Sequence, residues 1–461
     1  MSSFLIKPAF SIKGEIHLPA DKSISHRAVI ISSISKGRTT IKNFSSSKDC
    51  YYTIEALKKL GIKIIRRGSS LFVYGKGIRG LKGYKKPIFV GDSGTTLRLL
   101  LGVLAGQKFS TTLTAGKFLS RRPMKRVTQP LRMMGAKIWP RAILRQAQDT
   151  SPKDTERIRS ESQEQKVGEE YPPITIYGGD LKAITYKLPV ASAQVKSAIL
   201  LAGLYAKGRN KVIEPIPTRD HTERMLELFG AALKVKGKGK EIIIKGKQQL
   251  ISPAHIDIPG DISSASFFIV AALIVKNSSL IIRFVNLNPR RIGLIKVLKR
   301  MGGDIKVAIQ EPRSKNQEPV GDIIVKTSQL KGTKIKRREI PSLIDELPIL
   351  MVAACFAKGK TIIESVEELR VKETDRVSSM VEGLLKLGAK IKVIRQNNQE
   401  NIIITGVKHL IGARVSSFGD HRTAMSLIIA GLKAKNTLID DVTCINKSFP
   451  TFLETLDRVI Q

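Results

Sequence analysis

One local pattern recurs along this chain and constrains its fold more than any other feature: an amphipathic helical stretch, a glycine, and then alternating apolar residues. The glycine suits the left-handed position that ends a helix, and the alternation has the period of a half-buried strand. Five copies have their helical parts and glycines at 54–61, 130–135, 224–230, 295–302 and 382–388, and a helix at 451–460 fits a truncated sixth. Their spacing of about 70 to 95 residues is too wide for a solenoid. We therefore predict α/β subdomains that pack into larger domains.

The chain has 461 residues, which is too long for one ordinary core, so we expect two domains of roughly 200 residues each. Cys50, Cys355 and Cys444 form no C-x-x-C pair, which argues against a disulfide framework, a redox motif or a zinc site. The N-terminus has no signal-peptide pattern, and the longest apolar runs, such as 267–275, are well short of the ~20 residues that cross a bilayer. We expect a soluble, cytoplasmic protein without membrane association.

The formal net charge of +40 creates a positive field that attracts anions. Nucleic acid is one candidate partner. However, the lysines are spread along the chain in short runs such as 58–59, 85–86 and 234–240, and aromatic residues make up only 5%, which leaves few platforms for base stacking. We favour a lysine-rich solvated surface over a dedicated nucleic-acid face, and we expect no specific nucleic-acid partner.

Residues 141–171 interrupt the second copy of the pattern. They are rich in charged and polar residues and nearly free of large apolar ones. A segment of this composition cannot bury enough apolar surface to fold by itself. We predict a disordered surface insertion here, centred on 146–170, and assign it no function.

Polar and basic turns precede several apolar helical runs. The turn at 20–27 places a serine-rich helix start between Lys22 and Arg27, and the turn at 91–98 places the small Gly94 at a helix start. Free backbone N–H groups and basic side chains at such turns attract a phosphate or carboxylate, although ordinary N-capping by the serines is the alternative. Similar turns occur at 119–123, 191–196 and 417–422. Open α/β architectures place their ligand contacts at turns of this kind.

Carboxylates within this basic set are fewer. Asp345 precedes an apolar run and could accept a proton from a hydroxyl, with N-capping of that helix as the alternative. If the run 370–376 opens a helix, Lys372 and Arg376 share one face, which is costly unless an anion lies between them. Glu373 could then move a proton beside that anion; a solvated surface pair of Glu373 with Arg376 is the alternative. The chain has no metal-binding or nucleotide-binding motif, so we expect neither a metal nor a cofactor.

Nine motifs, taken in order, resemble the 5-enolpyruvylshikimate-3-phosphate synthase family. They are D-K-S-I-S-H-R (21–27), G-D-S-G-T-T-L-R (91–98), R-R-P (121–123), S-A-Q-V-K (192–196), R-D-H-T-E (219–223), I-D-E-L-P (344–348), R-V-K-E-T-D-R (370–376), G-D-H-R (419–422) and N-K-S-F-P (446–450). The resemblance runs from about Lys13 to the C-terminus and leaves out only 141–171. It implies transfer of the enolpyruvyl group of phosphoenolpyruvate to the 5-hydroxyl of 3-phosphoshikimate, with release of phosphate, in the pathway to chorismate and the aromatic amino acids. This family needs no cofactor.

The resemblance also implies an α/β (α+β) fold: a two-domain, inside-out α/β barrel of six βαβαββ-type repeats, with the substrate cleft between the domains. Crossings near Asp21 and 259–261 would make one domain discontinuous. Its parts would be 1–20 and 260–461, and the other domain would be 21–259. Helix N-termini from both halves would then point at the cleft, and closure on the substrates would complete the site. We expect a monomer whose partners are its two small-molecule substrates.

Site residues follow from the same resemblance. Those implied to bind 3-phosphoshikimate are Lys22, Ser23, Arg27, Ser192, Ala193, Gln194, Arg219, Asp345 and Lys372. Those implied to bind phosphoenolpyruvate are Lys22, Gly94, Arg122, Gln194, Arg376, Arg422 and Lys447. As catalytic residues, Asp345 would take the hydroxyl proton, and Glu373 with Lys22 would handle the proton at C3 of phosphoenolpyruvate. His421 is a further candidate for orienting Glu373 or the phosphate, and Asp92 stands where relatives usually carry asparagine.

Two other functions stay open at this point. UDP-N-acetylglucosamine enolpyruvyl transferases share the fold and the donor but use a different loop, and K-E-T-D-R together with G-D-H-R favours the shikimate acceptor. The second is a basic nucleic-acid-binding protein that has kept this fold, whose binding would fall steeply with salt. Against it, the anion-holding residues occupy predicted turns rather than a basic tail.

Overall fold

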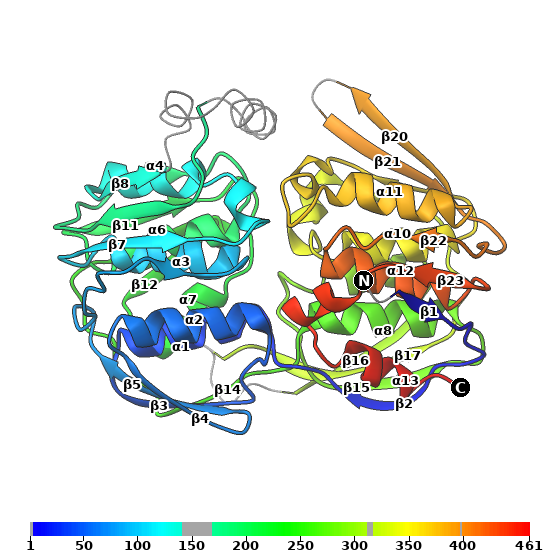
Figure 1. Cartoon of the computed structure of the whole chain (residues 1–461), viewed down its shortest axis with the longest axis horizontal. Helices are drawn as coiled ribbons and strands as arrows, with labels where there is room; N and C mark the ends of the chain where they lie inside the picture. Colours follow the sequence, from blue (N-terminus) through cyan, green and yellow to red (C-terminus); the bar gives the residue numbers. More distant parts are fainter. Residues whose placement is uncertain (1–2, 141–167, 311–316, 397–398) are drawn as a thin grey trace, which may run out of the picture.

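The chain folds into two lobes that lie side by side, with both termini in the second lobe (Figure 1). This computed structural model describes residues 3–140, 168–310, 317–396 and 399–461. One buried hydrophobic cluster is made of residues within 20–258, and the other joins residues within 6–18 to residues within 262–459. The predicted domains are compatible with these clusters, and their boundaries stay a prediction.

The described strands form six small sheets, and five of them share one pattern: a parallel pair extended by two antiparallel pairs. The first lobe contains the sheets β14 (His255–Asp257)-β3 (Lys36–Lys42)-β5 (Ser70–Lys76)-β4 (Lys63–Arg67), β6 (Ile88–Phe89)-β7 (Ser110–Thr114)-β9 (Ile174–Tyr177)-β8 (Lys137–Pro140) and β10 (Thr185–Lys187)-β11 (Arg209–Ile213)-β13 (Glu241–Lys245)-β12 (Leu233–Lys236). The second lobe contains β16 (Asp304–Gln310)-β17 (Val320–Lys326)-β15 (Ser279–Asn286)-β2 (Lys13–His17) and β18 (Lys334–Ile335)-β19 (Lys360–Ile363)-β21 (Gln399–Thr405)-β20 (Lys390–Gln396). The predicted α/β class is confirmed.

The sixth sheet, β1 (Phe4–Ile6)-β23 (Thr437–Ile439)-β22 (Arg414–Val415), has three strands. Its β22 and β23 are parallel, as in the other sheets, but the antiparallel neighbour β1 comes from the start of the chain. The chain then ends with the short helix α13 (Phe452–Asp457). The final repeat is therefore truncated, as the sequence pattern predicts.

The five glycines of the repeat end helices, as predicted. Those helices are α2 (Lys48–Lys59), α4 (Lys125–Met134), α7 (His221–Leu228), α9 (Gly293–Arg300) and α11 (Arg376–Lys386). Each is followed by a glycine with a positive φ, for example +85° at Gly61. In the first copy, Ile62 donates its backbone N–H to the carbonyl of Leu57 at 3.0 Å, which satisfies a carbonyl that the helix end would leave unpaired.

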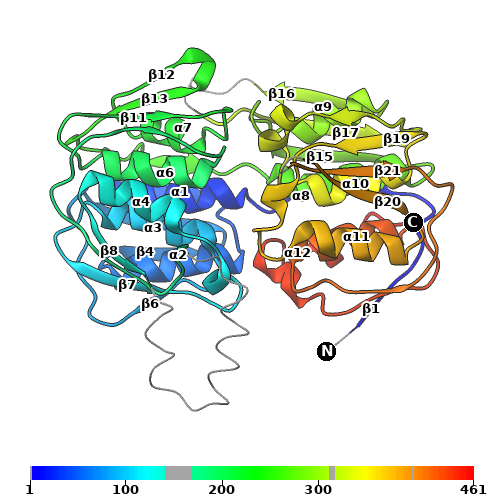
Figure 2. The same ribbon diagram turned by 90° about the horizontal axis from the view of Figure 1, so that it is seen from above.

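Six central helices make up the interior of the lobes. They are α1 (Lys22–Ser33), α3 (Gly94–Leu104) and α6 (Ala193–Gly203) in one lobe and α8 (Ile262–Ile274), α10 (Leu347–Cys355) and α12 (His421–Gly431) in the other (Figure 2). Apolar residues occur all around these helices, as expected of helices enclosed on every side, and every residue of α8 and α10 is buried. Within the described ranges, no helix combines the length and apolar character that a bilayer crossing requires. Short 3-10 helices are η1 (Leu119–Arg121), η3 (Gly237–Gly239), η4 (Arg337–Ser342), η5 (Glu367–Leu369) and η6 (Thr443–Lys447).

The chain passes between the lobes at two adjacent places. On one side of these passages β2 pairs with β15, and on the other β14 pairs with β3. The passages are hydrogen-bonded to each other, since Asp21 donates its N–H to Pro259 at 2.7 Å and Asp261 donates to Pro19 at 3.0 Å. Asp21 and Asp261 also cap α1 and α8 through their side chains. The connection therefore fixes where two central helices, one from each lobe, begin.

Most of the predicted insertion, residues 141–167, lies outside the described residues. The last four residues of the predicted stretch are described, and they are packed against α4. The Glu170 side chain pairs with Arg132 at 2.6 Å, its carbonyl accepts from the Met124 N–H at 2.8 Å, and Tyr171 is buried. This end of the stretch therefore belongs to the folded lobe, because a buried aromatic ring and a paired carboxylate anchor it.

Candidate active site

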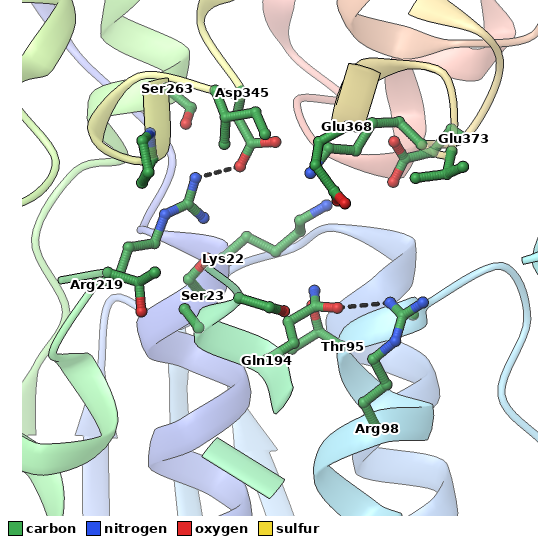
Figure 3. A pocket seen from close by; sticks show the side chains of 18 of the residues that line it. Lys22, Ser23, Thr95, Arg98, Gln194, Arg219, Ser263, Asp345, Glu368 and Glu373 are labelled. Carbon is green, nitrogen blue, oxygen red and sulfur yellow. Dashed lines mark hydrogen bonds and ion pairs between the residues drawn. The ribbon is translucent and has the colours of Figure 1, made fainter. Parts of the chain in front are cut away.

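A pocket lies between the two lobes, where the six central helices begin (Figure 3). Its lining includes Lys22 and Ser23 of α1, Gly94 and Thr95 of α3, Ala193 and Gln194 of α6, Ser263 of α8, Asp345 just before α10, and His421 and Arg422 of α12. A helix N-terminus carries partial positive charge and unpaired N–H groups, so it favours an anion. Six such ends meet at one place, and the pocket is therefore suited to a ligand with several negative charges.

The pocket's side chains are dominated by charge. Its lining contains nine basic side chains, Lys22, Arg98, Arg122, Arg126, Arg219, Arg291, Lys372, Arg376 and Arg422, and five acidic ones, Asp49, Asp261, Asp345, Glu368 and Glu373. The excess of cations adds to the field of the helix ends. Hydroxyl and amide groups of Ser23, Thr95 and Gln194 supply neutral donors and acceptors between them.

Capping explains why the helices begin here. Asp21 accepts from the Ile24 N–H at 3.0 Å, and Ser93, Ser192 and Asp420 cap α3, α6 and α12 in the same way. The serines at 23 and 25 are therefore not the N-caps, and Ser23 lines the pocket instead. Asp345 is not a cap either, because the N-cap of α10 is Glu346.

Thirteen of the fifteen predicted site residues line this pocket: Lys22, Ser23, Gly94, Arg122, Ser192, Ala193, Gln194, Arg219, Asp345, Lys372, Glu373, Arg376 and Arg422. Two do not. Arg27 is buried behind the pocket wall, where its guanidinium donates to the Ser23 carbonyl at 2.8 Å and to the Ser197 hydroxyl at 2.9 Å. Lys447 lies outside the lining, with Nζ 3.1 Å from the Gly419 carbonyl oxygen and 4.0 Å from the centre of the Phe118 ring.

Asp345 pairs with arginines of both lobes. Arg219 forms an ion pair with it across the cleft, as Figure 3 shows, and Arg376 lies 3.6 Å from its other oxygen. The Arg422 guanidinium donates to the Asp345 carbonyl at 2.9 Å. Burial alone would raise the pKa of Asp345, but Arg219 and Arg422 outweigh it and hold that pKa well below its ordinary value. Asp345 is therefore ionised.

Glu373 lies between two arginines. One of its oxygens accepts from Arg376 at 2.5 Å, and the other lies 3.3 Å from Arg122 of the opposite lobe. Burial would raise the pKa of Glu373, but these two arginines dominate and hold it well below its usual value. A ligand anion that drew Arg122 or Arg376 away would weaken that effect and let Glu373 carry a proton.

The run 370–376 is not helical before its last residue. Helix α11 begins at Arg376 with Asp375 as its N-cap, so Lys372 and Arg376 do not share a helix face. Arg370 supports the run from outside the pocket by pairing with Glu400 at 2.6 Å. The like-charge spacing expected for a helix is therefore avoided, because the segment bends into the pocket and places Lys372 and Glu373 in its lining.

Lys372, His421 and Lys22 of the lining also have shifted pKa values. Burial lowers the pKa of Lys372 to about 8, against the attraction of Asp345. Burial likewise lowers the pKa of His421 to about 3, so this imidazole is neutral near pH 7. Burial alone would lower the pKa of Lys22, but pairing with Asp49 at 2.8 Å outweighs it and raises that pKa.

Several lining residues were not among the predicted site residues. Arg98 donates to the Gln194 side chain at 2.6 Å, and Gln194 donates in turn to Thr95 at 2.9 Å. Both Arg98 and Thr95 belong to the turn at 91–98, so the motif contained that signal. Arg126 and Glu368 pair across the cleft at 3.2 Å. No motif indicated either residue, because each lies among charged residues of the kind common on a protein surface.

Asp92 does not point into the pocket. One of its carboxylate oxygens accepts the N–H groups of Phe118 and Leu119, both at 3.0 Å, and the other lies 3.9 Å from Lys447 Nζ. Its charge therefore holds a turn of the first lobe and attracts Lys447 of the second.

A protein-family model described as EPSP synthase (3-phosphoshikimate 1-carboxyvinyltransferase) matches residues 6–148 and 162–456, and leaves out 149–161 inside the predicted insertion. The 3-phosphoshikimate 1-carboxyvinyltransferase of Thermoanaerobacter sp. (strain X514) is 46% identical over 455 residues, covering 98% of this chain and 99% of the relative. That of Geotalea uraniireducens (strain Rf4) is 43% identical over 461 residues, with both chains fully covered. A solved EPSP synthase from Acinetobacter baumannii superposes with a TM-score of 0.82 and 38% identity, covering 100% of this chain and 98% of that one. Geometry, family model and relatives agree, and the chain belongs to the EPSP synthase family.

Proposed function

We propose that this chain transfers the enolpyruvyl group of phosphoenolpyruvate to the 5-hydroxyl of 3-phosphoshikimate and releases phosphate, by addition and elimination through a tetrahedral intermediate. The observation that carries the proposal is the pocket itself, where nine basic side chains and six helix starts surround the two half-buried carboxylates Asp345 and Glu373. The two substrates bring about six negative charges, which such a site can neutralise in a water-poor cleft. The relatives named above carry this activity in their names.

For 3-phosphoshikimate, the proposed contacts are Lys22, Ser23, Ser192, Ala193, Gln194, Arg219, Asp345 and Lys372, all of which line the pocket. Arg27 has a different part in the proposal. Because its guanidinium donates to the carbonyl of Ser23, it positions the start of α1 behind the ligand, and direct contact would need a rearrangement.

For phosphoenolpyruvate, the proposed contacts are Lys22, Gly94, Arg122, Gln194, Arg376 and Arg422, with Lys447 joining them after a movement of its side chain. Gly94 leaves room between two guanidinium groups, since a Cβ there would lie 2.8 Å from Arg98 and 2.9 Å from Arg122. A small anionic group fits in the space that a side chain at position 94 would fill.

In the proposed reaction the ionised Asp345 accepts the proton of the 5-hydroxyl of 3-phosphoshikimate. The hydroxyl oxygen meanwhile forms a bond to C2 of phosphoenolpyruvate. Glu373 delivers a proton to C3 with Lys22 nearby, and this gives the tetrahedral intermediate. Glu373 then takes a proton back from C3 as the C2–O bond to phosphate breaks, and Asp345 gives up its proton to the released phosphate or to solvent. Positioning and electrostatic stabilisation by the surrounding cations supply most of the rate.

The proposal includes a monomer that acts in the cytoplasm without a cofactor, a metal or a nucleic-acid partner. Its three cysteines are buried and free, which fits a reducing compartment.

The acceptor distinguishes the candidate functions. In a coupled phosphate-release assay with phosphoenolpyruvate, we expect turnover with 3-phosphoshikimate and none with UDP-N-acetylglucosamine. Turnover with the nucleotide sugar alone would identify the other enolpyruvyl transferase. Binding to DNA or RNA that falls steeply with salt, without turnover of either acceptor, would favour the nucleic-acid function.

Replacing either proposed proton carrier should stop the chemistry and spare binding. Glu373→Gln and Asp345→Asn should each lower kcat by about 10²- to 10⁴-fold, the usual loss when a positioned acid or base is removed. Calorimetry should still detect both substrates. The matched control is Glu382→Gln, which removes the charge of an exposed ion pair with Lys386 on the same helix as Arg376. This variant should keep full activity. Near-normal turnover of either site variant would remove that residue from its role.

Asp92→Asn should improve the use of phosphoenolpyruvate. The amide oxygen can still accept the N–H groups of Phe118 and Leu119, but the charge that attracts Lys447 is lost. We expect the KM for phosphoenolpyruvate to fall by about threefold, the size expected for a weak ion pair. Asp180→Asn, which alters a surface pair with Arg79, is the control. An unchanged or higher KM in Asp92→Asn would contradict the proposed competition for Lys447.

Lys372 should make the binding of 3-phosphoshikimate depend on pH. Its pKa of about 8 means that it is charged below that pH and neutral above it, and only the charged form attracts the ligand. Between pH 7 and 9.5 the Kd of the wild type should therefore rise by about tenfold. Lys372→Arg stays charged throughout and should show a nearly flat profile. A flat wild-type profile by calorimetry would contradict this role.

A further inference from the structure

A fully buried charge cluster lies behind the wall of the pocket. Lys196 of α6 has no exposed surface, and its Nζ lies 2.9 Å from Glu214 and 2.6 Å from Glu223. The two glutamates are 1% and 3% exposed. None of the three lines the pocket. Burying such groups is costly, so their mutual pairing must be maintained for any of them to stay charged.

Glu214 connects this cluster to the pocket wall. One of its oxygens accepts from Lys196, and the other accepts both the backbone N–H of Thr218, at 3.2 Å, and the Thr218 hydroxyl. Thr218 lines the pocket, and the next residue, Arg219, reaches Asp345. The segment from β11 to α7 has no regular structure of its own, so its position depends on side-chain anchors such as Glu214.

The cluster also joins three elements of the first lobe. Lys196 lies one turn into α6, whose first residues Ala193 and Gln194 line the pocket. Glu223 belongs to α7, and Glu214 directly follows the end of β11. Burial raises the pKa of Glu223 against the attraction of Lys196. Lys196 also donates a hydrogen bond to Glu214.

We propose that the buried pair of Lys196 and Glu214 is a positioning element that sets the affinity for 3-phosphoshikimate, by fixing the 214–219 segment against the first turn of α6. The inference rests on the proposed function. Neither residue touches the ligand. Gln194 of the first turn of α6 is shared by both substrates, but the arginines proposed to hold phosphoenolpyruvate, including Arg122 and Arg376, lie on other elements. We therefore expect the pair to affect donor binding much less than acceptor binding.

The test compares two substitutions of Glu214. Glu214→Gln keeps an acceptor for Thr218 but loses the charge opposite Lys196, and Glu214→Met loses both. We expect the KM and the calorimetric Kd for 3-phosphoshikimate to rise about tenfold in Glu214→Gln and further in Glu214→Met, as for a lost charged hydrogen bond. The KM for phosphoenolpyruvate should stay within about twofold. Glu241→Gln, which alters the surface pair with Lys211 in the same lobe, is the matched control and should change nothing.

A role in folding alone gives a different result. In that case the variants would lose Tm while both KM values moved together or not at all, and this outcome would overturn the inference. If Glu214→Met does not fold, Glu214→Gln decides the matter. The failure of the proposed function is recognised separately, since the wild type would then not release phosphate, whereas calorimetry with 3-phosphoshikimate still tests the pair.

Discussion

The arrangement of the site depends on one buried guanidinium. Arg376 is 1% exposed and lies against three carboxylates, with Asp420 at 2.8 Å, Glu373 at 2.5 Å and Asp345 at 3.6 Å. A charge at this depth is tolerated only when it is paired, so the cation and its partners hold one another in place. The two carboxylates proposed to move protons are thereby set at a fixed spacing by the same group. An anionic ligand that engages Arg376 changes the proton affinity of both.

The repeated architecture explains why so much positive potential gathers at one point. Each repeat contributes one central helix, and the capping residues Asp21, Ser93, Ser192, Asp261 and Asp420 make five of the six helices begin at the pocket. The hydrogen bonds between the two passages of the chain keep the starts of α1 and α8 together. The helix dipoles therefore act together without any single residue having to supply the field.

Local features of the fold were predictable from the sequence, and long-range ones were not. A glycine after a helical pattern, such as Gly61, indicates a left-handed residue that ends the helix. The helix ends could therefore be predicted without knowledge of the tertiary structure. The motifs likewise identified most of the pocket lining. They do not show whether a residue lines the pocket. Arg27 belongs to one of these motifs, yet it lies outside the lining and its guanidinium donates to Ser23, Ser197 and Thr222.

Contacts between the two lobes across the cleft also could not be predicted from the sequence. Arg126 and Glu368 meet only because the two lobes approach each other, and nothing within either segment signals a partner 242 positions away. The condition that the run 370–376 opens a helix is not met, and a long-range contact is again involved. Arg370 of this run pairs with Glu400 of a later strand, a partner that the run itself does not signal.

The pairing of β1 with β23 has a consequence for how the chain is made. All the residues of the first lobe's hydrophobic cluster lie within 20–258, so that core can close while synthesis continues. The second lobe has to wait, because residues 4–6 find their partners only at 437–439. At roughly 5 to 20 residues per second, that interval is about 20 to 90 seconds. During this interval the β1 residues have no partner strand, because β23 has not yet been synthesised.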